Sequence, residues 1–198
     1  CSSDLTTHQP EWGMRLRMLA EFTKGERNFA LSLATLVALA GLFFALAGQD
    51  VLIQTHGAMA AAAAALALLY LVITYSAPEP AAGRLERYYD GPTKVGVVLA
   101  MIFAVVGFLV GDWVAWLLYN PNLTFDAGWA SFGRIRPLHT SAVIFGFGGN
   151  ALIATSFYIL QRTSRVRLAD PVGAWFVLLG YNLFCAIAAS GYLLGVTQ

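Results

Sequence analysis

A histidine that follows two arginines is the group in this sequence best placed to carry chemistry. His139 ends the run Arg-Ile-Arg-Pro-Leu-His at 134–139 and precedes a long apolar stretch. Because proline suits the first turn of a helix, Pro137 predicts that His139 is the third helical residue, about one turn inside a membrane boundary. Ionisable side chains within membrane segments are rare and usually functional. Taken alone, such a histidine is more often an interfacial packing residue than a ligand.

The neighbours of His139 favour a ligand. Gly146 and Gly149 follow on the same helical face, where the missing side chains would let a flat macrocycle or another helix approach. Arg134 and Arg136 lie just before the apolar stretch. A haem would use all three features, since imidazole is a common axial ligand of haem iron and guanidinium groups pair with propionates. The alternatives are close helix packing through small residues and arginines that reach lipid phosphates.

The composition is that of an integral membrane protein. Of the 198 residues 58% are hydrophobic and only 12% are charged, against about 25% charged in soluble domains. Five apolar runs are long enough to cross a bilayer as helices, and these runs cover residues 28–48, 57–76, 93–119, 137–161 and 172–195. We therefore predict an all-α fold, a polytopic transmembrane helix bundle with five spans.

Helix-breaking residues separate the predicted spans. Pro78 and Pro80 follow the second span, and residues 120–122 (Asn-Pro-Asn) follow the third. Asp170 and Pro171 precede the fifth, which predicts a capping carboxylate and a proline in the first turn.

Positive charge predicts the orientation. All Lys and Arg residues except Arg134 and Arg136 fall on one side of the five spans, and such an excess marks the cytoplasmic side. We expect a multi-pass protein of a bacterial inner membrane with its N-terminus in the cytoplasm. Residues 49–56 and 120–136 should then face the periplasm. The two exceptional arginines suggest an anionic group on that side.

One stretch carries a specific family resemblance. FGRIRPLHTSAVIFGFGGNALIATSFYILQRT, at 132–163, resembles the second core helix of the catalytic subunit of cbb3-type cytochrome c oxidases, in the haem-copper oxidase superfamily. The similarity continues through 174–198 and, more loosely, back through 85–111. It implies a partial haem-copper oxidase subunit I fold, an N-terminal fragment of that subunit.

The resemblance also implies a division of the chain. Residues 1–27 would be an N-terminal cytoplasmic segment, 28–76 an extension of two transmembrane helices, and 93–198 the first three core helices, truncated. We expect the first residues to be a processing artefact, because CSSDL lacks an initiator Met. A lipoprotein beginning at Cys1 is the alternative.

For matching positions, the resemblance implies that His139 is one axial ligand of the low-spin haem b. Arg136, and after it Arg134, would hold its propionates. The second axial histidine, the high-spin haem b and the copper ligands would lie in sequence beyond this chain, so the fragment alone would lack the oxygen-reduction site. The intact enzyme would pass electrons from cytochrome c to oxygen, form water and pump protons. Its partners would be c-type cytochrome subunits and membrane lipid, with no nucleic acid.

Other functions and roles stay open. A nitric oxide reductase large subunit shares the fold, and a transporter or structural bundle is the alternative outside enzymes. Asp112 interrupts the third span and is interpreted as reaching the interface, pairing with an outer arginine or, less favoured, serving a proton path. Cys185 lies in an apolar run, so it predicts no disulfide, and no CxxCH motif occurs to attach a c-type haem.

Overall fold

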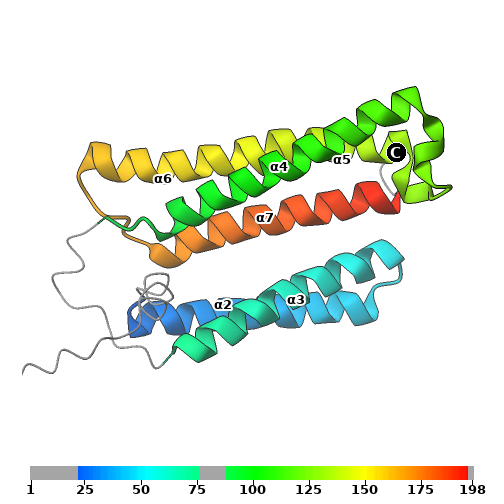
Figure 1. Ribbon diagram of the computed structural model, residues 1–198. Helices are drawn as coiled ribbons and strands as arrows, with labels where there is room; N and C mark the ends of the chain where they lie inside the picture. The colour runs from blue at the N-terminus through cyan, green and yellow to red at the C-terminus, as the bar shows by residue number, and fades with distance from the viewer. Residues whose placement is uncertain (1–21, 76–87, 196–198) are drawn as a thin grey trace, which may run out of the picture.

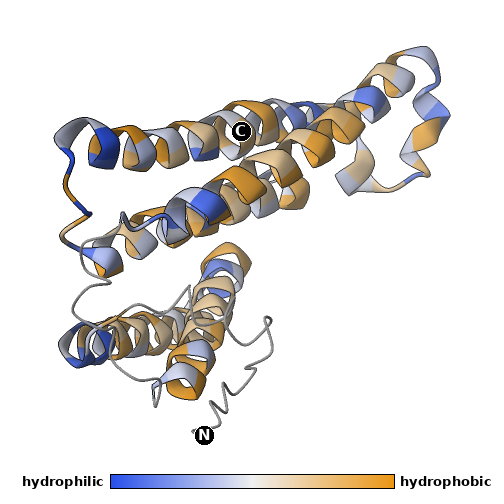
Figure 2. Ribbon diagram, turned by 60° about the vertical axis from the view of Figure 1, so that its left-hand side comes forward, coloured by the Kyte–Doolittle hydropathy of each residue, from blue (hydrophilic) through white to orange (hydrophobic). Residues whose placement is uncertain are grey.

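The computed structural model describes residues 22–75 and 88–195, and within them all regular structure is helical. These ranges hold five helical segments long and apolar enough to cross a membrane, as predicted. They comprise α2 (Lys24–Ala47), α3 (Val51–Thr74), α4 (Gly91–Tyr119), a composite of α5 (Phe132–Ser141), η4 (Ala142–Gly149) and α6 (Asn150–Ser164), and α7 (Pro171–Leu194). Hydrophobic residues run along most of each helix, and hydrophilic ones lie mainly at the ends and connections (Figure 2).

The first two helices form a tight hairpin (Figure 1). Thr23 and Glu26 make a capping box at the start of α2, and Asp50 caps α3 by accepting a hydrogen bond from the Leu52 amide at 3.0 Å. Glycines allow the two helices to touch, since a Cβ on Gly41 would lie 2.6 Å from the Ala61 backbone nitrogen. The hairpin therefore owes its closeness to backbone contact rather than to large side chains.

The remaining helices form a second group, in which α4, the α5–η4–α6 composite and α7 lie side by side (Figure 1). Asp170 caps α7 by accepting a hydrogen bond from the Gly173 amide at 2.8 Å, and Pro171 is its first residue. α4 ends at Tyr119, directly before the Asn120–Asn122 turn. Both sequence signals are confirmed. Pro78 and Pro80 lie outside the described residues.

Three helix starts differ from the prediction by four or more residues. α2 begins at Lys24 rather than Asn28, because Thr23 supplies an N-cap. α3 begins at Val51 rather than Gly57, because Asp50 supplies an N-cap and leaves only a short turn after α2. α5 begins at Phe132, so Pro137 lies inside the helix and not in its first turn. Proline lacks the amide hydrogen for a helical bond, and a π-helix, η4, follows a few residues later. His139 is thus deeper in its helix than predicted.

The bundle has two ends with different connections. The α2–α3 turn, the start of α5 and the end of α7 lie at one end, where Ser190 Oγ and His56 Nε2 are 3.3 Å apart. Two short 3₁₀ helices, η2 (Pro121–Thr124) and η3 (Gly128–Ala130), connect α4 to α5 there. We call this the His139 end. The starts of α2, α4 and α7 and the end of α6 make the opposite end, which we call the Arg162 end.

Candidate functional site

The His139 ring lies against α4, the neighbouring helix. Its Nδ1 is 2.8 Å from the carbonyl oxygen of Gly107. The ring occupies the space that a side chain at Gly111 would need, because a Cβ there would lie 2.5 Å from Cε1 and 2.8 Å from Nδ1. The imidazole is half-buried and faces into the helix bundle rather than outward. A pair of glycines one turn apart on α4 therefore forms its seat.

The Gly107 carbonyl fixes the chemistry of the two ring nitrogens. A carbonyl oxygen can only accept a hydrogen bond, so Nδ1 must carry the proton and donate it. Neutral imidazole then has its lone pair on Nε2, for which no hydrogen-bond partner is found among residues 22–75 and 88–195. This is the arrangement in which metal-binding histidines are usually held, with one nitrogen on a backbone oxygen and the other available to the metal.

The two arginines before His139 differ in the contacts of their guanidinium groups. The Arg134 guanidinium donates to the Leu193 carbonyl at 3.1 Å and packs on Gly195, which ends α7 with a φ of 75°. A cation at that position satisfies a terminal carbonyl and the helix dipole. The Arg136 guanidinium is exposed and makes no hydrogen bond or ion pair to the described part of the chain. Arg136 is the arginine still available for an anion.

The space predicted beside the glycines of the His139 helix is absent, so this expectation was wrong. Any Cβ on Gly146 would collide with the Phe103 ring, and one on Gly149 would collide with the Tyr181 hydroxyl group. The two glycines accommodate side chains from α4 and α7. They permit helix packing, the alternative considered from the sequence, and do not leave a free face for a macrocycle.

The helix changes its winding three residues after His139, at Ala142. η4 is a π-helix of 8 residues, and π-segments are frequent at functional sites. α7 holds it in place, since the Tyr181 hydroxyl donates to the Phe145 carbonyl at 2.9 Å. Just below, Asn150 and Asn182 exchange amide hydrogen bonds of 3.0 and 2.8 Å. These bonds fix the rotation of the helix that carries His139.

Several of these residues were missed at the sequence level. Gly107 and Gly111 form a Gly-x-x-x-Gly pattern in GFLVG, a recognised signal for close helix approach. That pattern could have identified α4 as the neighbour of the histidine. Asp112, next to this seat, is exposed and forms no ion pair with a described arginine, so the pairing considered for it is not found there.

The Arg162 end contains a closed polar network. Arg162 forms two hydrogen bonds with the Asp90 carboxylate, of 2.6 and 2.7 Å, and its guanidinium lies over the Tyr158 ring at 4.1 Å. These bonds from Arg162 hold the pKa of the Asp90 carboxyl below its ordinary value. Gln161 is buried and bonds both the amide and the carbonyl of Tyr89, at 2.7 and 3.0 Å. This network ties the start of α4 to the end of α6.

Comparison with known proteins finds one matching family and several similar proteins. The family described as Cytochrome C and Quinol oxidase polypeptide I matches residues 92–198. The bacteroid cytochrome c oxidase subunit 1 homolog of Bradyrhizobium diazoefficiens is 46% identical over 181 residues, 89% of this chain and 33% of that protein. The cytochrome c oxidase subunit 1 homolog of Azorhizobium caulinodans is 58% identical over 112 residues, 57% of this chain and 20% of that protein.

A third relative bears a more specific name. The cbb3-type cytochrome c oxidase subunit CcoN1 of Stutzerimonas stutzeri is 46% identical over 101 residues, 51% of this chain and 21% of that protein. No solved structure matches the chain significantly. The chain spans about a third or less of the length of these curated relatives. With five membrane-span helices and a family match over more than half of its residues, the chain is an integral membrane protein that belongs to the cytochrome c and quinol oxidase polypeptide I family.

Proposed function

We propose that this chain is part of the catalytic subunit of a cbb3-type terminal oxidase, and that His139 is one axial ligand of its low-spin haem b. The intact enzyme would take electrons from cytochrome c, reduce oxygen to water and pump protons. The names of the relatives support an oxidase subunit. The observation that carries the haem assignment is the His139 ring itself, bonded through Nδ1 to Gly107 and open at Nε2.

The residues around His139 fit an axial ligand. When bound, the haem would accept and pass on single electrons. The Gly107 carbonyl keeps the proton on Nδ1, makes Nε2 the stronger donor to iron and restricts rotation of the ring. Gly111 provides the space for the imidazole plane against α4. Because Gly107 and Gly111 already hold the ring in place, it would need little reorganisation to bind iron.

Arg136 is the propionate partner that the geometry favours. It is exposed at the His139 end, and no described residue competes for its guanidinium. Arg134 is committed to the end of α7 through the Leu193 carbonyl, so it would contribute to a propionate only with its remaining donors. We therefore rank Arg136 before Arg134 as a contact of the haem.

The rest of the assembly follows from the same proposal. The second axial histidine, the high-spin haem b and the copper ligands would belong to the remaining two thirds of the subunit. Its partners would be c-type cytochrome subunits. The protein would sit in the bacterial inner membrane with its N-terminus and the Arg162 end in the cytoplasm, since Lys24, Lys94 and Arg162 lie at that end.

The experiment is replacement of the histidine in the full-length protein. His139→Ala should abolish the low-spin b-haem band in the reduced-minus-oxidised spectrum and stop electron entry. The matched control is His56→Ala, which removes a half-buried histidine at the same end of the bundle, whose Nε2 lies 3.3 Å from Ser190 Oγ. The control should keep the normal spectrum. A normal low-spin band in a folded His139→Ala protein would overturn the assignment.

A further inference from the structure

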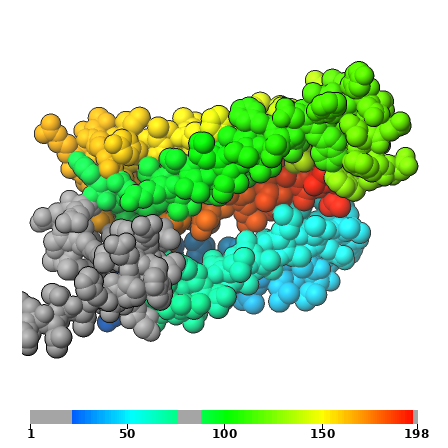
Figure 3. Space-filling model, viewed as in Figure 1, coloured from blue at the N-terminus to red at the C-terminus, as the bar shows by residue number. Residues whose placement is uncertain are grey.

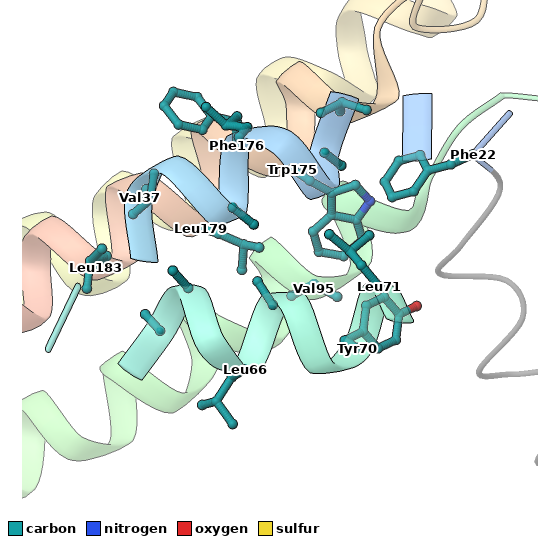
Figure 4. A pocket seen from close by; sticks show the side chains of 18 residues that line it. Phe22, Val37, Leu66, Tyr70, Leu71, Val95, Trp175, Phe176, Leu179 and Leu183 are labelled. Atoms are coloured by element: carbon teal, nitrogen blue, oxygen red, sulfur yellow. The ribbon is translucent and has the colours of Figure 1, made fainter. Parts of the chain in front are cut away.

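An apolar cavity of about 650 Å³ separates the α2–α3 hairpin from the other helices. Hydrophobic side chains of both groups line it, among them Val37 and Leu66 of the hairpin and Leu179 and Leu183 of α7 (Figure 4). A hollow between α3 and α7 is visible on the molecular surface (Figure 3). The volume is in the range of ~300–1,000 Å³ found for small-molecule sites.

Small residues on the hairpin create this space. Alanines at 30, 34, 63, 64 and 67 supply its side of the lining. The hairpin touches itself through backbone at Gly41 and Gly57, yet opposite α7 it presents alanines that do not fill the gap. Water does not fill such a cavity stably, because it finds no polar partners there. In a bilayer, the apolar molecule available to fill it is lipid.

One end of the cavity lies at the Arg162 end, where cations gather. Phe22, Trp175 and Val95 line that part of the cavity (Figure 4). Lys24 follows Phe22 by two residues and Lys94 directly precedes Val95, and both lysines are exposed. Anionic lipid head groups are attracted by such juxtamembrane cations. The charge at this end therefore complements a phosphate group.

A polar atom in the lining also lacks a partner. The Tyr70 hydroxyl is buried, and no hydrogen-bond partner for it is found among residues 22–75 and 88–195, which is costly for a phenol in an apolar setting. Tyr70 and Leu71 of α3 and Trp175 of α7 lie at the same end of the cavity (Figure 4). A glycerol ester or phosphate oxygen entering beside it would satisfy this hydroxyl. An apolar channel, flanking cations and a polar atom in need of a partner together match the parts of one phospholipid.

We propose that the cavity binds one anionic phospholipid of the leaflet at the Arg162 end. An acyl chain lies along the alanine side of the hairpin, and the phosphate lies near Lys24 and Lys94. The lipid joins the α2–α3 hairpin to α4 and α7 where protein packing alone leaves a gap. This site is separate from His139, which lies at the other end of the bundle.

The test measures lipid retained by the full-length protein after extensive washing in detergent, by native mass spectrometry. The wild type should retain one phosphatidylglycerol. Ala67→Phe fills part of the cavity and should lower retention about tenfold, because the phenyl ring would occupy space that the acyl chain needs. Ala65→Phe, on the exposed face of α3, is the matched control and should retain lipid normally. Should Ala67→Phe fail to fold, Ala67→Val should give a smaller loss in the same direction.

A second pair of variants tests the head group. Lys24→Gln with Lys94→Gln should reduce the preference for phosphatidylglycerol over phosphatidylcholine, while Arg165→Gln, an exposed cation at the same end, should leave it unchanged. The proposal is overturned if the wild type retains no lipid or if folded Ala67→Phe retains as much as Ala65→Phe. It is equally overturned if a cross-linker at Ala67→Cys captures another polypeptide segment instead of lipid.

Discussion

The Asp90–Arg162 network and the His139 site, at opposite ends of the same helix bundle, differ in whether their polar side chains are paired. At the Arg162 end, Asp90, Gln161 and Arg162 bond one another or the Tyr89 backbone, so that a closed network joins two helices. At the His139 end, the imidazole keeps one nitrogen open and Arg136 has no described partner. Paired groups stabilise a fold, whereas polar groups left open inside a membrane protein indicate a ligand.

The largest effect on haem binding should come from filling the space beside Gly111 that the His139 ring occupies. Gly111→Ala in the full-length protein places a methyl group 2.5 Å from the ring, which must move away from α4. We expect most of the low-spin haem to be lost, since overpacking costs about 1–3 kcal/mol. Gly180→Ala, whose added Cβ meets nothing within 4 Å, is the control for haem content. Equal haem in both variants would contradict the role of the seat.

The next largest effect, on stability, should come from breaking the hydrogen bonds of Gln161 at the Arg162 end. Gln161→Leu removes the bonds to the Tyr89 amide and carbonyl and to the Leu168 amide at 3.2 Å. Since buried groups are left unpaired, unfolding should become easier by roughly 2–4 kcal/mol. Thermal unfolding in detergent measures this change, and Gln54→Leu on the exposed side of α3 is the control. The haem spectrum of the folded fraction should stay normal. A changed haem spectrum in Gln161→Leu with no loss of thermal stability would contradict a purely structural role for the Arg162 end.

Smaller effects are expected from replacing the two arginines, and they should appear in different measurements. Arg136→Ala should lower the reduction potential of the low-spin haem, because the reduced form loses a nearby cation. The expected change is on the order of 1 kcal/mol, roughly 40 mV for one electron. Arg134→Ala should instead weaken the end of α7 by about 0.3–1 kcal/mol. Redox titration and thermal unfolding separate them. An unchanged potential in Arg136→Ala would favour contact with lipid phosphate.

The smallest effect is the pH dependence of the Asp90–Arg162 pair. The folded-state pKa of Asp90 is lowered by its bonds to Arg162, so its contribution is fully present above the ordinary aspartate pKa, about 3.9. It is lost as the pH falls through the lower folded value. The difference in unfolding temperature between wild type and Asp90→Asn should be constant from about pH 5 to 8 and vanish in acid.

The membrane helices were predictable because long apolar runs and their breakers carry the signal locally. Asp170 and Pro171 mark the start of α7, and the Asn-Pro-Asn turn marks the end of α4. The start of α5 was misplaced because proline was read as a first-turn residue, whereas the helix tolerates Pro137 in its interior. The start of α3 was misplaced because Asp50 could be read as loop or cap. Local pattern decides the existence of an element better than its boundary.

The central residue of the site, His139, could be predicted from the sequence, but the residues that contact it could not. His139 could be selected because an imidazole in an apolar run is unusual. That the ring rests on α4, and that Phe103 and Tyr181 fill the spaces beside Gly146 and Gly149, depends on contacts between helices that the sequence does not encode locally. The same holds for Arg134, whose partner in α7 lies 59 residues away. Only the spacing of Gly107 and Gly111 offered a usable signal.

Chemical rescue of the histidine tests the central claim most directly. In the full-length protein, His139→Gly removes the imidazole and leaves its seat between Gly107 and Gly111. If His139 binds haem iron, the low-spin b-haem band should disappear and return when free imidazole is added to the purified protein. Methylimidazole substituted at the nitrogen that replaces Nδ1 should restore it less well, because it cannot donate to the Gly107 carbonyl. A low-spin band that persists in His139→Gly without imidazole would contradict the account.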